Sequence, residues 1–99
     1  MPLRSVIVAS ALMVTTLSVA SAQQSAPNTD RPGGDYKNFE VGIPDNCRES
    51  CLKDLRCQAW TFVKPGIQGQ RARCWVKDSA PQPVSNPCCT SDTRAVRID

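Results

Sequence analysis

The sequence predicts a small α+β domain in which one short helix lies against β-strands and disulfide bonds supply much of the stability. Three observations support this. Cys47, Cys51 and Leu55 recur every four residues, as on one face of a helix. The runs 57–63 and 72–77 are rich in strand-forming residues and flank a loop containing Pro and Gly. Six cysteines accompany few large apolar residues in a chain of 99, which is typical of small exported domains that need covalent staples.

Residues 1–22 are predicted to form a cleaved signal peptide. Arg4 precedes an apolar run over residues 6–19, and the small residues Ala20, Ser21 and Ala22 follow it. The alternative is a retained membrane anchor, but the run has about 14 residues where a spanning helix needs about 20. We therefore expect cleavage after Ala22, no membrane span in the mature chain, and a secreted or periplasmic location.

The start of the mature chain is predicted to be a disordered leader over residues 23–30, because it has no large apolar residue. The domain is then expected to cover residues 31–99. Residues 31–35 have turn composition, and the following segment is expected to be extended. Its apolar residues are Tyr36, Phe39, Val41 and Ile43.

A short helix is predicted to follow Pro44. Asp45 or Asn46 is suited to the N-cap, and Asn46 with Glu49 has the spacing of a capping box. Cys47 and Cys51 share one face of this helix, so both thiols should point at the same neighbouring segment.

The two strand-like runs are expected to sort their side chains by alternation. Counting from Cys57 places Ala59, Thr61 and Val63 on one face of the sheet. Ala72, Cys74 and Val76 of the second run are their expected neighbours on that same face. Trp60, Phe62 and Trp75 then fall on the other face, either as a second core layer covered by residues 36–43 and 95–98 or as an exposed ligand surface. Composition favours the core. Residues 80–87 are expected to form an irregular connection to Cys88 and Cys89, and residues 94–99 a closing edge strand.

Composition also excludes several functions. The chain has no histidine, so catalysis by Ser-His or Cys-His pairs and histidine-ligated zinc are excluded. A net charge of +3 without a basic stripe argues against nucleic-acid binding. The cysteines show no Cys-x-x-Cys knuckle, and no motif pairs carboxylates in a cleft. We expect no catalytic residue, no metal and no cofactor.

The order of these features resembles a PAN/Apple domain, in the short form found in exported bacterial proteins. The resemblance is carried by the helix pair Cys47 and Cys51, the segment 57–62 with Cys57, Ala59, Trp60 and Phe62, and the run 74–77 that begins Cys-Trp. An opening like residues 31–36 and a late Cys-Cys pair also fit. The resemblance covers roughly residues 30–91.

This resemblance implies an antiparallel sheet packed on one helix, with structural disulfides from Cys47 to Cys74 and from Cys51 to Cys57. Fuller Apple domains have an outer disulfide, but residues 30–46 hold no cysteine, so Cys88 and Cys89 have no obvious partner but each other. Adjacent Cα atoms lie about 3.8 Å apart, below the usual range of about 4.4–6.8 Å, so such a bond is expected to be strained and easily reduced.

The implied function is that of a non-catalytic recognition module that binds a protein or a carbohydrate, such as a polysaccharide, outside the cytoplasm. Contact residues are expected on irregular exposed segments. They are Arg31, Asp35, Tyr36, Lys64, Gln68, Gln70 and Arg71. Two alternatives remain open: a thiol-exchange protein that uses Cys88 and Cys89, and an exported inhibitor-like peptide that presents the loop 64–71 to a protease.

Overall fold

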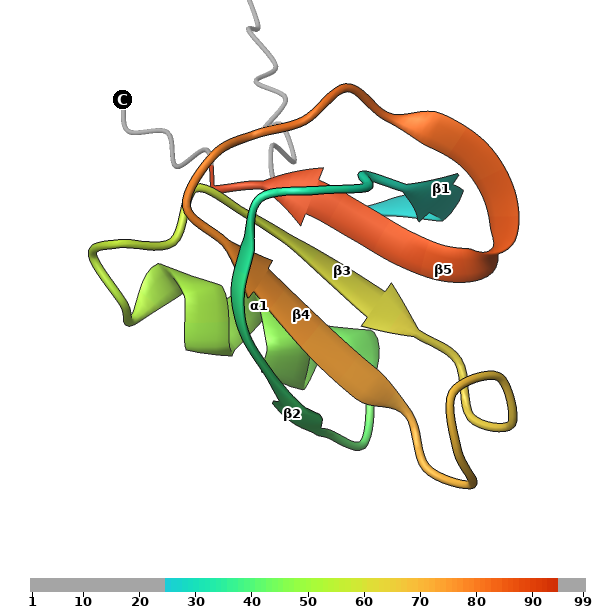
Figure 1. Ribbon diagram of the computed structural model, residues 1–99. Coiled ribbons are helices and arrows are strands. Elements are labelled where there is room, and N and C mark those ends of the chain that lie inside the picture. The colour runs from blue at the N-terminus through green and yellow to red at the C-terminus, as the bar shows by residue number, and fades with distance from the viewer. Residues whose placement is uncertain (1–24, 95–99) are drawn as a thin grey trace, which may run out of the picture.

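The computed structural model describes residues 25–94, which form a five-stranded antiparallel sheet with one helix against one face (Figure 1). The strands lie in the order β1-β5-β3-β4-β2. This confirms the predicted α+β class and the antiparallel sheet packed on one helix. The elements along the chain are β1 (Ala26–Asp30), β2 (Asp35–Glu40), α1 (Pro44–Leu52), β3 (Ala59–Val63), β4 (Arg73–Lys77) and β5 (Val84–Thr93).

Helix α1 begins two or three residues earlier than a cap at Asp45 or Asn46 predicts. Ile43 is the N-cap in an extended conformation and makes no side-chain cap bond, so the expected caps at Asp45 and Asn46 are wrong. Pro44 takes the first helical position, where a missing N–H costs nothing. Asp45 lies in the first turn, where its negative charge interacts favourably with the positive end of the helix dipole and so stabilises the helix.

The far end of α1 is held by the last described residue. The Arg94 guanidinium donates hydrogen bonds to the Leu52 carbonyl at 3.2 Å and to the Cys57 carbonyl at 3.1 Å. Carbonyls at a helix end have no partner within the helix. Arg94 therefore ties the end of β5 to the turn that follows α1.

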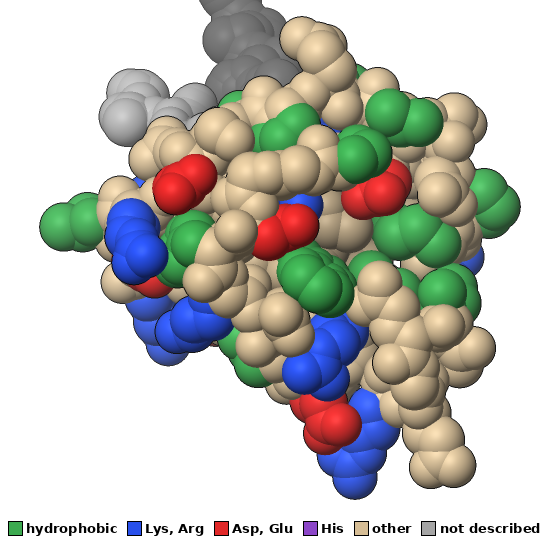
Figure 2. Space-filling view, viewed as in Figure 1, with side chains coloured by type: hydrophobic (Ala, Val, Ile, Leu, Met, Phe, Trp, Pro, Cys, Tyr) green, Lys and Arg blue, Asp and Glu red, His purple; other side chains and the backbone are tan. Residues whose placement is uncertain are grey.

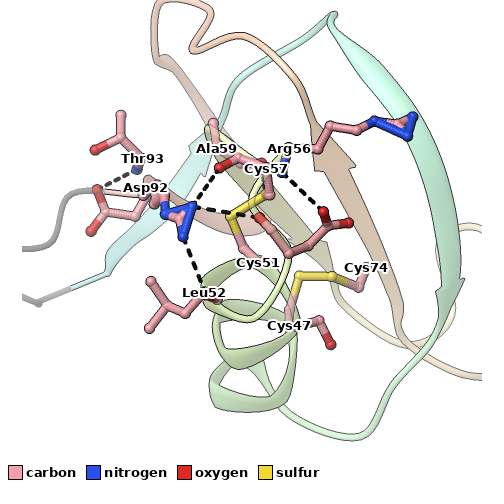
Figure 3. Close-up of a disulfide and its surroundings, with 12 residues drawn as sticks. Cys47, Cys51, Leu52, Arg56, Cys57, Ala59, Cys74, Asp92 and Thr93 are labelled. Carbon is pink, nitrogen blue, oxygen red and sulfur yellow. Dashed lines mark hydrogen bonds between the residues drawn. A yellow bond between two sulfur atoms is a disulfide. The ribbon is translucent and has the colours of Figure 1, made fainter.

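Two disulfides join the helix to the sheet as the family resemblance implied. Cys47 is bonded to Cys74 on β4, and Cys51 is bonded to Cys57 in the turn before β3 (Figure 3). The Cα atoms of each pair lie 5.3 and 5.2 Å apart, respectively. All four cysteines are fully buried, so the bonds run through the core.

The side-chain faces of β3 are the reverse of the prediction. Trp60 pairs with Val76 and Phe62 with Cys74, and these residues share the face that packs on α1. Cys57 lies in the turn before β3 rather than in the strand, so alternation counted from it assigns the wrong face. Trp60, only 1% exposed, and Phe62 are core residues, as the favoured interpretation held.

The cover over this core agrees with the prediction in part. Tyr36, Phe39 and Val41 pack against the buried cluster, as expected for residues 36–43, but α1 provides the main layer. The other expected cover, residues 95–98, lies outside the described residues.

Two segments expected to be irregular are strands. The predicted disordered leader, residues 23–30, contains β1, which pairs with β5. Likewise, residues 84–87 belong to β5 rather than to an irregular connection, and β5 occupies the place between β1 and β3. Backbone pairing across the sheet orders these polar segments where side-chain hydrophobicity gives no signal. The domain boundary at residue 31 is therefore too late for the described fold.

The remaining predictions concern the two ends of the chain. The signal peptide over residues 1–22 lies outside the described residues, as does most of the edge strand expected over residues 94–99. Across residues 25–94, no helix has the length and apolar character needed to cross a membrane.

Candidate functional site

A cleft of about 430 Å³ lies on the face of the sheet opposite α1. Its floor comes from β3 and β4, and β1, β5 and the turn before β2 rise around it. Figure 1 shows β5 strongly curved with β1 alongside, and Figure 2 shows acidic and hydrophobic side chains near one another across this face. The lining residues are Asp30, Pro32, Gly33, Asp35, Thr61, Val63, Ile67, Gln68, Trp75, Lys77, Asn86, Cys88 and Cys89.

Trp75 gives the cleft its aromatic surface. It lies on β4, facing away from the core, and is partly exposed. Its indole Nε1 donates a hydrogen bond to Gln68 Oε1 at 2.8 Å, so the hairpin loop fixes the position of the ring. With the N–H already used, the surface that Trp75 offers a ligand is mainly apolar.

An ion pair between the buried Lys77 and the solvent-exposed Asp35 closes one end of the cleft. Lys77 is only 2% exposed, and its Nζ contacts Asp35 Oδ1 and donates to the Gly33 carbonyl at 3.2 Å. Gly33 and Gly34 both have positive φ values, 105° and 74°, which L side chains rarely adopt. The glycine turn thus carries Asp35 back over β4, and the carboxylate compensates a buried ammonium that would otherwise be costly.

Two buried hydroxyls on the same face have no hydrogen-bond partner among the described residues. Thr61 is 2% exposed and lines the cleft, and Ser91 is its paired residue on β5. Neither Thr61 Oγ1 nor Ser91 Oγ is satisfied within residues 25–94. Buried hydroxyls are nearly always paired, so an unpaired one beside a cleft has capacity to bind a ligand or water.

The pairing of β1 with β5 is interrupted beside the cleft. Pro27 pairs with Thr90, and Thr29 pairs with Ser85. Between these two pairs the chain advances by two residues in β1 (29 − 27) and by five residues in β5 (90 − 85). The three extra residues of β5 bulge away from β1. Cys88 and Cys89 lie in this bulge and are bonded to each other, which confirms the expectation that they have no other partner.

An acidic group lies beside this vicinal disulfide. A carboxylate oxygen of Asp30 and the Sγ atoms of Cys88 and Cys89 lie within 4.8 Å of one another. Metals bind cysteine as the thiolate, and these sulfurs are bonded to each other. In the oxidised protein the group therefore offers an acceptor carboxylate next to two apolar sulfur atoms.

Of the contact residues predicted from sequence, the structure brings Asp35 and Gln68 together in the cleft. Lys64 is exposed outside the cleft lining. Gln70 and Arg71 line a second, shallower depression, where Arg71 lies 3.5 Å from Glu40. The predicted set is thus divided between different parts of the surface.

Arg31 and Tyr36 make contacts within the protein. Arg31 Nη1 donates to the Pro81 carbonyl at 2.9 Å and ties the opening turn to the β4–β5 connection. Tyr36 packs on the core side of the sheet, and its hydroxyl donates to Asp54 Oδ2 at 2.6 Å. Burial and this hydrogen bond raise the pKa of Tyr36 to about 12. The same bond, chiefly, lowers the pKa of Asp54.

Sequence reasoning missed Asp30, Thr61 and Lys77 as site residues. Asp30 falls in the segment predicted to be a disordered leader, and nothing local to it marks a strand. The position of Thr61 on the cleft face follows from side-chain alternation once β3 is known to begin at Ala59. The sequence correctly places Trp75 away from the helix, but only the fold shows that it lines a cleft.

Comparisons with known proteins give a family match and a similar viral protein. The profile of the PAN domain family matches residues 29–77. An uncharacterized protein of Acanthamoeba polyphaga mimivirus is 36% identical over 53 residues, which cover 54% of this chain and 14% of that protein. This chain therefore spans only a small part of that relative's length.

The family match agrees with the described fold. It begins in β1 and ends in β4, and it includes the helix with its two cysteines and both of their disulfide partners. PAN domains are typically non-catalytic modules that mediate protein or carbohydrate interactions. Through residues 29–77, this chain belongs to the PAN domain family.

Proposed function

We propose that this protein is a non-catalytic, extracytoplasmic recognition domain that binds a carbohydrate in the cleft opposite α1. The observation that carries this proposal is the combination, in one hollow, of the apolar surface of Trp75 with the unpaired Thr61 hydroxyl. A sugar ring has an apolar C–H face and a rim of hydroxyl groups. Those two features match an aromatic wall and nearby hydrogen-bonding groups.

The size of the cleft favours a saccharide over a protein as its occupant. Small-ligand sites usually have volumes of about 300–1,000 Å³, and this cleft has about 430 Å³. A stable protein interface instead buries about 800 Å² on each partner. The cleft therefore fits one or two sugar rings, as at the end of a glycan chain.

The charges of the cleft favour a neutral ligand. Lys77 is compensated by Asp35, so the ammonium is not free to bind an anion. Asp30, at the end of β1, adds a carboxylate acceptor to the same cleft. Carboxylates accept hydrogen bonds from sugar hydroxyls and repel anionic ligands.

Export is consistent with this function. The three disulfides need an oxidising compartment, and residues 1–22 have the pattern of a signal peptide. Thiol exchange at Cys88 and Cys89 is the weaker candidate. Cys89 is only 1% exposed, and the neighbouring carboxylate of Asp30 repels the thiolate that would attack the disulfide.

The test is a titration of the oxidised protein, monitored by calorimetry and by NMR. The probes are methyl glycosides of glucose, galactose, mannose and N-acetylglucosamine at millimolar concentration. We expect one of them to bind, and Trp75→Ala to weaken binding at least about tenfold, which corresponds to about 1.4 kcal/mol. Leu55→Ala is the matched control, since this side chain is 88% exposed and lies outside the cleft.

Two results would contradict the proposal. The first is that none of the glycosides binds the wild-type protein. The second is that Trp75→Ala and Leu55→Ala bind equally well, which would place the ligand elsewhere on the domain.

A further inference from the structure

The Cys88–Cys89 disulfide does not act as a staple in the way that the other two disulfides do. A disulfide stabilises chiefly by closing a loop in the unfolded chain, and the effect grows with loop length. This one joins neighbours in sequence, so it closes no loop of consequence. Its place in the fold needs another explanation.

The fold holds the pair rigidly at the wall of the cleft. Asn86 Oδ1 accepts a hydrogen bond from the Cys88 N–H at 3.0 Å, and the Cys88 carbonyl accepts one from the Lys64 N–H at 3.0 Å. Cys89 is buried opposite Val63 of β3. The bulge is thus fixed by the Asn86 side chain, which belongs to the bulge, and by backbone hydrogen bonding to the residue that follows β3.

The chemistry of the bonded pair is that of a contact surface. A disulfide has no S–H donor, and its sulfur atoms are polarizable and pack well against C–H groups. Asp30 places an anionic acceptor within 4.8 Å of both sulfurs. An apolar surface with an acceptor at its edge suits a ring that has a C–H face and hydroxyl donors at its rim.

We propose that the Cys88–Cys89 disulfide is a ligand-contacting wall of the cleft, against which a sugar ring packs while Asp30 accepts hydrogen bonds from its hydroxyls. This inference rests on the proposed carbohydrate-binding function and adds a second apolar surface to Trp75. The contact surface is the partly exposed Cys88, and the bond to buried Cys89 holds it in place. The bond is therefore required in its oxidised form, because a free Cys88 thiol would not be fixed at the cleft wall.

The first test compares three variants with the same methyl glycosides. We expect Cys88→Ser/Cys89→Ser to weaken binding at least about tenfold. No loop is opened, so the thermal midpoint should fall only through the hydroxyl that is placed in the buried position 89. Asp30→Asn, which keeps the shape of the side chain and removes its charge, should also weaken binding. Leu55→Ala again serves as the control.

The outcomes separate this inference from the proposed function. If Trp75→Ala loses binding but the double serine variant keeps wild-type affinity, the disulfide is no ligand wall and only the recognition function stands. If the wild type binds none of the glycosides, both proposals fail.

A second measurement covers the case in which the double variant does not fold. In an amide NMR titration of the wild-type protein, the signals of Cys88, Cys89 and the Trp75 indole should shift together as the glycoside is added. Shifts at the Trp75 indole without any at the two cysteines would overturn the inference.

Discussion

The disulfide between Cys47 and Cys74 should contribute more stability than the one between Cys51 and Cys57, and the difference follows from loop length. The first closes a loop of about 28 residues (separation 27 plus one) and the second about 7 (6 plus one). In the chain-entropy relation these loops correspond to about 3.6 and 2.4 kcal/mol at 25 °C. Both values are large beside the net stability of a typical folded protein, which is roughly 5–15 kcal/mol.

Replacing each pair by alanine tests this difference of about 1.2 kcal/mol. All four sulfurs are fully buried, so the packing loss is comparable in the two variants and largely cancels in the comparison. Thermal unfolding followed by the fluorescence of buried Trp60 should show Cys47→Ala/Cys74→Ala melting roughly 5–10 °C below Cys51→Ala/Cys57→Ala. Equal midpoints, or the reverse order, would refute the loop-length argument.

Three further predictions concern single side chains. The chain has one tyrosine, and because the pKa of Tyr36 rises from 10.0 to about 12 in the folded state, the stability linked to this shift is complete below pH 10 and is lost as the pH rises toward 12. Absorbance titration of the phenol should give a pKa of about 12. In Tyr36→Phe the fall in stability between pH 10 and 12 should disappear. A titration midpoint near 10 in the wild-type protein would exclude the burial of this phenol. Arg94→Ala should lower the free energy of unfolding by about 1–3 kcal/mol through its lost carbonyl bonds, with Arg94→Lys in between, and urea unfolding that finds the two variants equal would contradict this. Thr61→Val should raise the free energy of unfolding by about 1 kcal/mol, because it removes a buried hydroxyl without a partner among the described residues, and should weaken glycoside binding; a loss of stability would show that this hydroxyl is satisfied in solution.

The sequence by itself determined the local elements and their chemistry. The four-residue spacing of Cys47 and Cys51 places both on one helix face, and the β-rich runs mark β3 and β4, because these signals depend on near neighbours in the chain. The family resemblance added the pairing of the four core cysteines. The oxidised pair Cys88 and Cys89 followed from the lack of any other partner.

Only the tertiary structure decided the register of β3, the existence of β1, and the cleft. A one-residue offset reverses the face of every side chain in a strand. The turn at Cys57 supplies that offset, so Trp60 lies on the core face and Thr61 on the cleft face, the reverse of the prediction. β1 is polar, and its order comes from backbone hydrogen bonds to a strand far along the chain. Asp30 and Cys88 meet for the same reason: no local pattern encodes a contact that long-range strand pairing creates.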